Sequence, residues 1–569
     1  MKQIIFTLIA VIAALAPSTM SAYDIEVDGI YYIIYGNEAI VTFKGQTSYE
    51  EESYSGGVII PASFTYNGKT YSVTAIGGYA FEGCSRLTSV TIPNSVTIID
   101  EFAFFCCSSV SFINIPNSVT SIGEWAFSST SLTNIEIPNS VTAIAEGTFA
   151  SCSNLTNVTI PNSVTAIGDK AFSYCTRLNR IEIPNSVTAI GNEVFMDCSR
   201  LNSVTIPNSV TSIGQEAFYG CTRLTSIDIP NSVASIGDYA FRECTSLNSI
   251  DIPNSVTSIS SSAFWDCSSL TSITVESGNP AYDSRDNCNA IIETATNKLI
   301  SGCMNTIIPN SVTSIGEYAF LNCTGLTNID IPSSITSVSY SAFNGCTGLT
   351  SITVASGNAV YDSRDNCNAI IETATNTLLI GCMNTTIPNS IMSIGEWAFS
   401  FLTSLTSINI PNTVTAIGEF AFFDCKDLAS ITIPNSVISI GKRAFAACDK
   451  LKDVYSYIPD PSLLTMGSDV FYGYGITNAG RTLHVPSGSL VAYQADSKWS
   501  QFFETIVEME PITGDVNGDG VVTIKDVTDL IDQLLSGDEL PAYADVNGDG
   551  VVTIKDVTDL IDMLLNGGN

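Results

Sequence analysis

The sequence is short of basic groups. Lysine and arginine together number 22 against 56 aspartates and glutamates, with a single histidine, so the formal net charge is −34. A surface of this sign repels phosphate backbones and anionic membrane surfaces, and no run of lysines and arginines argues the other way. We therefore expect no nucleic-acid partner. The lone histidine, His484, lies beside an expected strand and is interpreted as structural.

Long hydrophobic runs are missing beyond the N-terminus. Residues 1–22 have the pattern of a signal peptide: Lys2 gives a positive start, residues 4–15 are apolar, Pro17 ends the run, and Ser21-Ala22 is a small-residue cleavage site. The run is too short to span a bilayer comfortably, although a membrane anchor is the alternative interpretation. We expect a secreted, extracellular protein without a membrane span, and association with a cell surface stays open.

Charged residues make up only 14% of the chain, whereas 45% are hydrophobic, which suits a core that runs the length of the molecule better than it suits disorder. The dominant feature is repetition of the string Ile-Pro-Asn-Ser-Val with little change, mostly in steps of 23 residues. The isoleucines of this string are Ile92, Ile115, Ile137, Ile160, Ile183, Ile206, Ile229, Ile252, Ile308, Ile331, Ile387, Ile410 and Ile433.

One repeat shows how a coil is built. Val204 and Ile206 alternate with polar residues, which is the spacing of a strand. Pro207 ends that strand because it has no N–H to donate. Gly214 punctuates a second short extended piece, and the segment from Ala217 to Cys221 has room for one helical or 3₁₀ turn. No single repeat buries its apolar face, but stacked repeats do, so the sequence predicts a β-solenoid of parallel stacked strands.

The pattern Leu-x-x-Ile-x-Ile-Pro-x-x-Val, followed by Ile-Gly and Ala-Phe-x-x-Cys, resembles the BspA-type leucine-rich repeats of bacterial surfaces. The resemblance covers about residues 60–511 and recurs more than a dozen times. It implies a leucine-rich-repeat solenoid, and a role in adhesion and protein recognition at bacterial surfaces. It implies no particular ligand, because the ligands of the family vary.

The repeat period sets the expected domain boundaries. They are an N-terminal β cap over residues 23–59, leucine-rich repeats over 60–450 with hairpin insertions at 276–306 and 355–385, a C-terminal cap of strand and then helix over 451–511, and a separate module over 514–569. The N-terminal cap is indicated by hairpin signals such as Asp28-Gly29, and the C-terminal cap by the loss of the period.

Cysteines fall into two groups. Twelve of the 17 occupy one position of the repeat, where Thr130 and Leu402 stand in two other repeats. A position that accepts these residues is a packing position, and a metal ladder would need paired ligands on each coil. The two insertions are near copies, and each places two cysteines opposite each other in its expected hairpin. Disulfides Cys288–Cys303 and Cys367–Cys382 are one interpretation, and free packed thiols are the other.

The last 55 residues hold two near-identical acidic loops, 30 residues apart. Oxygen ligands at loop positions 1, 3 and 5 converge because the loop curls around the ion, a glycine at position 6 permits the sharp turn, and positions 7, 9 and 12 complete the shell. The predicted ligands of two calcium ions are Asp515, Asn517, Asp519, Val521, Thr523 and Asp526, and Asp545, Asn547, Asp549, Val551, Thr553 and Asp556. An apolar stretch after each loop predicts a short amphipathic helix, which makes this a small all-α domain.

Residues 514–569 resemble a type I dockerin, and aspartate rather than glutamate at loop position 12 favours that family over EF-hands. The resemblance implies a cohesin-like partner, contacted at loop positions 10 and 11, here Ile524, Lys525, Ile554 and Lys555. Many dockerins carry hydroxyl residues at these positions, so the matching cohesin does not follow. Dockerins usually tether polysaccharide-degrading enzymes, which associates the chain with polysaccharide catabolism.

A row of acids is expected on the outer side of the stacked strands, where most residues are Ser, Thr and Asn. Glu136, Glu182, Asp228, Asp251 and Asp330 are equivalent in the repeat, so stacking lines them into a broken acidic stripe. The stripe is a candidate face for a protein or surface ligand. A simple solvated face that keeps the protein soluble is the alternative interpretation.

The sequence favours a binding or adhesion protein over an enzyme. Glycoside hydrolysis needs paired carboxylates beside the sugar bond, whereas the acids here are dispersed repeat by repeat, and we assign no catalytic residue. A structural spacer is the alternative function, and a dockerin-borne component of polysaccharide catabolism is a further one. Variation between repeats at the strand positions favours recognition, whereas uniform repeats favour a spacer. The oligomeric state does not follow from the sequence.

Overall fold

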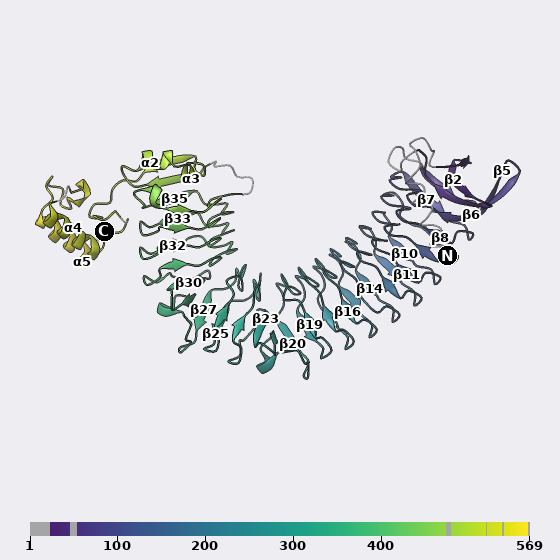
Figure 1. The fold of residues 1–569 in the computed structure, drawn as a ribbon, viewed down its shortest axis with the longest axis horizontal. Helices are drawn as coiled ribbons and strands as arrows, with labels where there is room; N and C mark the ends of the chain where they lie inside the picture. Colours follow the sequence, from purple (N-terminus) through teal and green to yellow (C-terminus); the bar gives the residue numbers. More distant parts are fainter. Residues whose placement is uncertain (1–22, 46–53, 474–479, 519, 538–539, 567–569) are drawn as a thin grey trace. The chain divides into compact units, whose positions relative to one another are not determined.

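The computed structural model describes residues 23–45, 54–473, 480–518, 520–537 and 540–566. The predicted signal peptide, residues 1–22, and the predicted calcium ligand Asp519 lie outside the described residues. The chain divides into two compact units, Met1–Ala295 and Thr296–Asn569. In both, successive coils repeat the same short strands and turns (Figure 1).

Each coil contains two short strands joined by turns. In one coil, β15 (Ser203–Thr205) turns Val204 into the core and its two neighbours to solvent. Pro207 follows this strand directly, and β16 (Ser212–Ile213) is the second extended piece, with Ile213 buried. The predicted alternation and the predicted break at proline are therefore both present.

The first strands of successive coils pair in parallel with a register of one repeat. Ile135 pairs with Val158, and Glu136 lies beside Thr159. In the first unit these strands are β4 (Gly56–Ile59), β7 (Leu87–Thr91), β10 (Asn134–Glu136), β12 (Asn157–Thr159), β14 (Arg180–Glu182), β15, β18 (Ser249–Ile252) and β20 (Ser272–Val275). In the second unit they are β25 (Asn328–Ile331), β27 (Ser351–Val354), β33 (Ser430–Ile433), β35 (Asp453–Ser456), β37 (Thr482–Val485) and β38 (Thr505–Glu508). Equivalent residues therefore stack into lines within each unit.

The second strands form a parallel row of their own, in which Ile213 pairs with Ile236 and Ile236 with Ile259. In the first unit this row contains β6 (Lys69–Ile76), β8 (Ile98–Ile99), β9 (Ser121–Ile122), β11 (Ala143–Ile144), β13 (Ala166–Ile167), β16, β17 (Ser235–Ile236) and β19 (Ser258–Ile259). In the second unit it contains β24 (Ser314–Ile315), β26 (Ser337–Val338), β31 (Ser393–Ile394), β32 (Ala416–Ile417), β34 (Ser439–Ile440) and β36 (Thr465–Met466).

The Ala-Phe-x-x-Cys segment forms hydrogen-bonded turns and not the helical or 3₁₀ turn that its length allows. In one coil Glu216 and Gly220 have left-handed φ angles of 53° and 68°. With these two left-handed residues in the turn, every second N–H points toward the next coil: Glu216 donates to Asp238 O at 2.8 Å and Phe218 to Ala240 O at 2.8 Å. A continuous helix would keep these bonds inside the coil.

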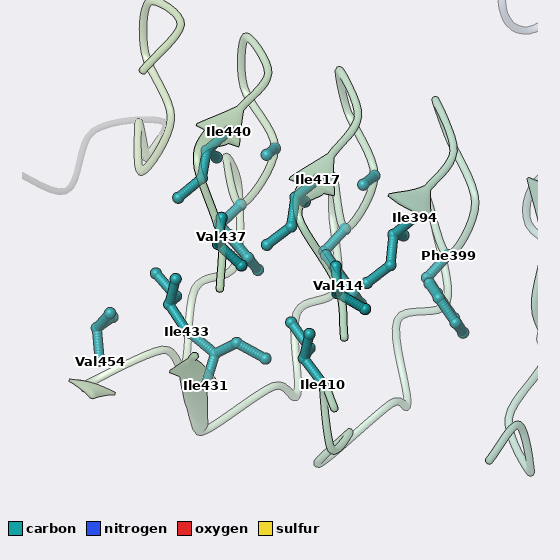
Figure 2. Close-up of a cluster of buried hydrophobic side chains, with 14 of the residues drawn as sticks. Ile394, Phe399, Ile410, Val414, Ile417, Ile431, Ile433, Val437, Ile440 and Val454 are labelled. Carbon is teal, nitrogen blue, oxygen red and sulfur yellow. The ribbon is translucent and has the colours of Figure 1, made fainter. Parts of the chain in front are cut away.

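A column of stacked phenylalanines fills the core beside these turns. The Phe218 and Phe241 rings lie 5.4 Å apart with an angle of 4° between their planes, and Phe241 repeats this arrangement with Phe264. In the second unit Phe399 and Phe422 stack at 5.0 Å in the same way. Figure 2 shows the isoleucines and valines of successive strands packed in lines in this unit. Each coil thus completes the core of its neighbours.

The repeated cysteine position is a packing position, as the sequence predicts. Its thiols are buried, and most also donate to a phenylalanine carbonyl of the preceding coil; Cys221 Sγ lies 3.3 Å from Phe195 O. Thr130, which takes the same position, donates to Phe127 O at 2.9 Å. Burial raises the pKa of the Cys152 thiol to about 11, which keeps it protonated as a donor.

The N-terminal segment joins the solenoid directly. β1 (Ile25–Val27), β2 (Ile30–Tyr35) and β3 (Glu38–Thr42) form an antiparallel meander, with the predicted turn at Asp28-Gly29, and β3 then pairs in parallel with β6. β5 (Ser63–Tyr66) pairs antiparallel with β6. Stacking begins at β4, inside the segment predicted as a cap, because Val58 takes the inward position that Val90 takes in the next coil.

The second insertion contains the predicted hairpin. β28 (Tyr361–Asp362), β29 (Ile370–Glu372) and β30 (Thr377–Ile380) are antiparallel neighbours, with a one-turn 3₁₀ helix at Arg364–Asn366. β30 then pairs in parallel with β31, so the hairpin supplies a strand of the second row. Gly381 follows β30 directly. A Cβ at this position would lie 2.1 Å from the Phe399 ring, so the close packing here requires glycine.

The first insertion repeats these elements on the two sides of the boundary between the units. β21 (Tyr282–Asp283) pairs antiparallel with β22 (Ala290–Glu293), and a 3₁₀ helix spans Arg285–Asn287. In the second unit, β23 (Lys298–Gly302) pairs in parallel with β24, which matches the role of β30 in the other copy.

Of the two interpretations of the insertion cysteines, free packed thiols are present and disulfides are not: all 17 cysteines are free, and Cys288, Cys303, Cys367 and Cys382 are buried. The second copy shows why. A bulge between Ile370 and Ile371 shifts the hairpin register by one residue, so that Cys382 faces Asn368 and its thiol lies 3.2 Å from the Asn368 carbonyl oxygen. Because the register shifts by one residue, Cys382 no longer lies opposite Cys367 in the hairpin.

The C-terminal end of the repeats combines strand and helix, as predicted. β35, β37 and β38 extend the first row, a 3₁₀ helix spans Pro461–Leu463, and α2 (Leu490–Ala495) and α3 (Ser497–Ser500) follow β37. Trp499 is fully buried and closes the phenylalanine column 6.0 Å from Phe471. The buried Arg481 donates to Leu451 O and Phe471 O, carbonyls that would otherwise face a further coil.

The last module is helical. α4 (Ile524–Ser536) and α5 (Ile554–Leu565) are the predicted helices, and a 3₁₀ turn spans Ala542–Ala544. Val527, Leu530, Val557 and Leu560 form the centre of a small core. None of the helices that the structure describes is long and apolar enough to cross a membrane.

The phenylalanine column predicts where the solenoid is sensitive to mutation. Phe218→Ala should cost about 3–5 kcal/mol, because it removes a fully buried ring and leaves a cavity. Phe112→Ala is the matched control, since Phe112 is 66% exposed and its loss should cost less than about 0.5 kcal/mol. Amide hydrogen exchange in the coils on either side of each residue measures the local effect. If the amides of the neighbouring coils were equally protected from exchange in both variants, the phenylalanine column would not stabilise one coil through the next.

Candidate functional site

The predicted acidic stripe is exposed in both units. Its members in the first unit are Glu136, Glu182, Asp228 and Asp251, and Asp330 takes the same position in the second. Threonines alternate with them in register: Thr205 beside Glu182, and Thr274 beside Asp251. The stripe is therefore broken, as the sequence predicts, and the structure brings its carboxylates together only in neighbouring coils such as those of Asp228 and Asp251.

The pairing of these acids differs along the stripe. Glu182 forms an ion pair with Arg180 of its own strand. Thr274 donates its hydroxyl to Asp251, and Thr353 to Asp330. Among the residues that the structure describes, no lysine or arginine forms an ion pair with Glu136, Asp228 or Asp251. These carboxylates thus carry charge that the protein itself does not neutralise.

The hydroxyl groups beside the stripe donate along the stacking direction. Thr156 Oγ1 lies 3.0 Å from Thr133 O, and Thr271 Oγ1 lies 3.0 Å from Asn248 O. A hydroxyl has one hydrogen to give, so these groups offer only lone pairs to a partner. Together with the carboxylates they make this face rich in hydrogen-bond acceptors.

An open groove of about 900 Å³ follows one edge of the stripe in the first unit. It is lined by Asn185, Ile206, Pro207, Asn208, Asp228, Ile229, Pro230, Asn231, Ser232, Asp251, Ile252, Pro253, Thr274 and Glu276. The prolines are buried, whereas the carboxylates before them and the asparagines after them are exposed, so the prolines form the floor. The sequence predicted Asp228 and Asp251 as members of the stripe. It did not predict that the proline row, the asparagine row and Glu276 would line a groove beside them. The signal for the proline and asparagine rows was the Pro-Asn pair that follows the first strand in most coils.

His484 has a structural place. Its Nε2 lies 3.0 Å from Asp453 Oδ1, and its ring stacks on Tyr455 at 4.3 Å. These contacts join β37 to β35, which agrees with the structural interpretation of this histidine.

Both acidic loops lead into a capped helix. Thr523 is the N-cap of α4 and Thr553 the N-cap of α5, and each forms a capping box with the aspartate three residues later, Asp526 or Asp556. The threonines were predicted as calcium ligands at position 9. Their side chains accept the backbone N–H two residues ahead and donate to the capping aspartate, because the first turn of each helix leaves N–H groups without partners.

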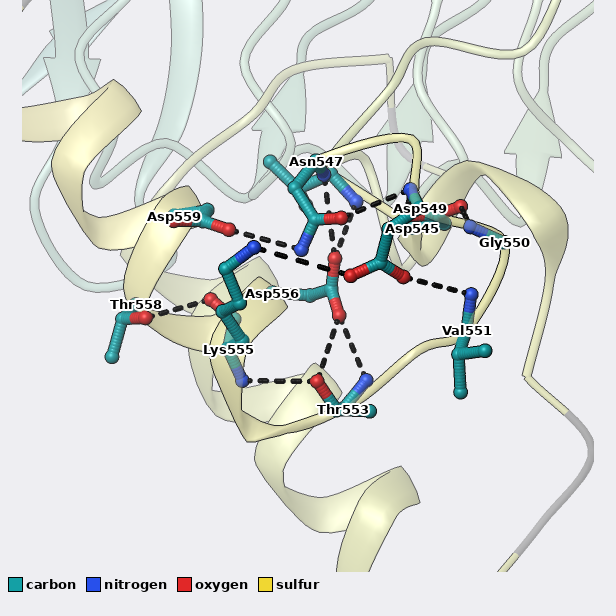
Figure 3. A network of polar contacts seen from close by, with 11 residues as sticks. Asp545, Asn547, Asp549, Gly550, Val551, Thr553, Lys555, Asp556, Thr558 and Asp559 are labelled. Atoms are coloured by element: carbon teal, nitrogen blue, oxygen red, sulfur yellow. Dashed lines mark hydrogen bonds and ion pairs between the residues drawn. The ribbon is translucent and has the colours of Figure 1, made fainter.

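The second loop is described in full (Figure 3). Asp545 accepts the N–H groups of Asp549 at 3.1 Å and Gly550 at 2.7 Å, and Gly550 has the left-handed φ of 87° that the sharp turn requires. Asp556 is buried beneath the loop and accepts from Val546 at 2.9 Å and Thr553 at 2.8 Å. Burial raises the pKa of Asp556, but its backbone N–H donors lower it by more, so that the pKa lies below its ordinary value.

The first loop shows the same contacts where it is described. Gly520 N lies 2.8 Å from Asp515 Oδ2, and Asp526 accepts the N–H groups of Asn517 at 3.2 Å and Thr523 at 2.8 Å. No group of three or more His, Cys, Asp or Glu side chains is gathered for a metal in the parts of the chain that the structure covers. The donors nevertheless fit a hard cation, since each loop offers carboxylate, amide and carbonyl oxygens around a buried aspartate.

The predicted docking residues are exposed. Ile524 and Ile554 are each 69% exposed at the first position of their helices. Lys525 Nζ lies 3.7 Å from Asp529, and Lys555 Nζ lies 3.9 Å from Asp549. Each half of the module thus presents an isoleucine and a lysine to solvent.

Comparison with known families matches both parts of this architecture. The model of the BspA type leucine rich repeat region (6 copies) matches residues 74–202, 189–296, 299–370 and 379–485, together more than half of the chain. The chain belongs to the BspA-type leucine-rich repeat family. Its C-terminal module is a dockerin: the model of the dockerin type I domain matches residues 513–565. Both are non-catalytic modules, and no catalytic domain is detected in this BspA-type chain.

Solved structures of similar proteins are bacterial leucine-rich repeat proteins. A leucine rich cell surface protein from Faecalibacterium prausnitzii is 28% identical, with 79% of this chain and 97% of that chain covered and a TM-score of 0.41. A leucine-rich repeat protein from Bacteroides ovatus is 24% identical, with 86% and 100% covered and a TM-score of 0.34. A T. pallidum leucine rich repeat protein is 28% identical, with 35% and 90% covered and a TM-score of 0.30. Among curated proteins, none matches this chain.

Proposed function

We propose that this protein is a secreted binding and adhesion protein. Its solenoid recognises a protein or surface ligand, and its dockerin attaches it to a cohesin-bearing complex or surface outside the cell. The observation that carries the proposal is the exposed acidic stripe, in which Asp228 and Asp251 have no basic partner of their own. Exposed carboxylates without a basic neighbour leave a negative potential on this face, which attracts a partner of opposite charge.

Variation between coils supports recognition over a spacer. The outward position that Glu136, Glu182 and Asp228 occupy holds threonine in the intervening coils. Two residues earlier in the strand, the outward side chains change from Asn134 to Arg180 and Ser203. A spacer needs only the buried positions, which stay nearly constant, so it gives no reason for such changes.

We propose further that the dockerin binds two calcium ions. The oxygen donors would be Asp515, Asn517, Asp519, Val521, Thr523 and Asp526 in one loop and Asp545, Asn547, Asp549, Val551, Thr553 and Asp556 in the other. Calcium would draw each loop together and fix the start of the helix that follows, which is where the docking residues lie. The residues of the chain supply the ligands, the glycine turn and the helix cap.

Calcium should be needed for the module to fold. The peptide of residues 514–569 should lose most of its helicity when calcium is chelated, because its core is too small to hold two short helices without ions. Circular dichroism with and without chelator measures this. Titration calorimetry should find two ions in the native sequence and one after Asp556→Asn. Helicity that survives chelation would count against the proposal.

The near-identity of the two halves predicts docking in two orientations. Lys525→Ala alone should weaken binding to a cohesin by less than about 3-fold, whereas Lys525→Ala with Lys555→Ala should weaken it by more than about 10-fold, or 1.4 kcal/mol. Lys498→Ala, outside the module, is the control and should change nothing. Surface plasmon resonance against a panel of cohesins measures all three. Loss of binding in the single variant would refute the symmetric mode.

The acidic stripe should speed association with a basic partner. The fragment of residues 23–511 would first capture ligands from host matrix, neighbouring bacteria or plant wall. Replacing Glu182, Asp228 and Asp251 by Ser should then slow association about 10-fold at low salt and leave the melting temperature nearly unchanged. Stopped-flow association at several salt concentrations measures the rate. An unaltered rate would move the search to the insertions at 276–306 and 355–385.

A further inference from the structure

The groove of the first unit is built from three parallel rows. The rows are the carboxylate and hydroxyl row of Asp228, Asp251 and Thr274, the proline row of Pro207, Pro230 and Pro253, and the amide row of Asn185, Asn208 and Asn231. Because the coils stack in a register of one repeat, each row advances by one strand spacing per coil, about 4.7–4.9 Å. A ligand along the groove therefore meets the same chemistry once per coil.

The charge of the groove selects its partner. Asp228, Asp251 and Glu276 line it, and among the described residues none of them has a lysine or arginine partner. Glu276 accepts the N–H of Asn254 at 2.9 Å, and Asp251 accepts the Thr274 hydroxyl. The carboxylates attract positively charged groups, and the buried prolines beside them form an apolar floor. A partner that fits must carry basic and apolar side chains side by side.

We propose that this groove binds a basic, amphipathic α-helical segment of a partner protein, which lies along the stacking direction with one helical turn on each coil. The inference rests on the proposed function, since it names the class of segment that the solenoid recognises. It goes further in assigning the groove, and not the whole stripe, as the docking site.

The argument for a helix is one of spacing. A helix returns the same face every 5.4 Å, through residues i, i+4 and i+7. This differs from the coil spacing by only about 0.6 Å per turn, which long lysine side chains absorb over three coils. An extended chain returns the same face about every 6.6–6.8 Å and falls out of step with the rows after one coil. Lysines on one edge of the helix then meet Asp228 and Asp251 on successive coils, and apolar residues beside them lie over the prolines. A further lysine reaches Glu276, which takes the proline position in the last coil of the groove.

Two synthetic peptides test the proposal with the full-length protein. One has lysines and leucines at helical spacing over four turns, and the other has the same composition with two central residues exchanged for proline, which breaks the helix. Fluorescence anisotropy at physiological salt should give an affinity at least about 10-fold higher for the helical peptide, because only that peptide keeps step with the coils.

Variants of the protein locate the site. Asp228→Ser with Asp251→Ser should weaken binding of the helical peptide at least about 10-fold. Glu101→Ser with Glu124→Ser is the matched control, because it removes two exposed carboxylates one repeat apart on another part of the coils, and it should change affinity by less than about 2-fold. Asn231→Trp fills the groove without changing charge and should weaken binding at every salt concentration.

The outcomes separate this proposal from the one on which it rests. Equal binding of both peptides, or equal loss in the control variant, would overturn the groove proposal in favour of general attraction between opposite charges. If neither peptide bound, the groove proposal would also be overturned. The proposed function would still stand if capture of surface ligands depended on the acidic stripe. If capture of surface ligands did not depend on the stripe, and peptide binding survived in the groove variants, both proposals would be contradicted.

Discussion

The backbone of each coil gives its hydrogen bonds to the neighbouring coil, and the rest of the solenoid depends on this exchange. In the turns, every second N–H points to the neighbouring coil, as those of Glu216 and Phe218 do toward Asp238 and Ala240, and left-handed residues such as Glu216 and Gly220 allow this geometry. The short strands do the same in parallel pairs. A single coil would leave these groups unpaired, so the structure is stable only as an array.

This exchange constrains what each position can hold. The phenylalanine column and the cysteine position repeat because each ring stacks on a ring of the next coil and the thiols bond to the preceding one. Thr130 is accepted because its hydroxyl is satisfied within its own coil, by Phe127 O. The second insertion is tolerated for the same reason. Its strand β30 pairs with β31 as a repeat strand would, and Gly381 yields the space that the Phe399 ring occupies.

Stacking also converts single residues into surfaces. One outward position per coil becomes the acidic stripe, and the Asp-Ile-Pro-Asn order within a coil becomes a groove with charged, apolar and amide rows. The dockerin positions its exposed residues in a different way. There each aspartate of a capping box closes a loop and starts a helix, which ties the exposed Ile524 and Ile554 to the state of the loops.

Much of the fold was predictable because its signals are local and repeated. The alternation around Val204, the break at Pro207, the packing role of the cysteines, the hairpin of the second insertion and the two capped helices all follow from residue types at fixed spacing. Repetition made these signals strong, because most of the patterns occur more than once in the chain. The stripe of acids followed from the same register.

Other features were decided only by the tertiary structure. The sequence allowed a 3₁₀ turn after Ala217, but hydrogen bonding between coils favoured left-handed residues and an open turn. It placed Cys367 opposite Cys382, but a bulge at Ile370 shifted the register by one residue. The sequence alone thus determined the repeat, its strands and the composition of the calcium loops, because these rest on local patterns. The groove, the unpaired state of Asp228 and Asp251 and the hairpin register depended on the packing of one coil against another, which no single repeat encodes.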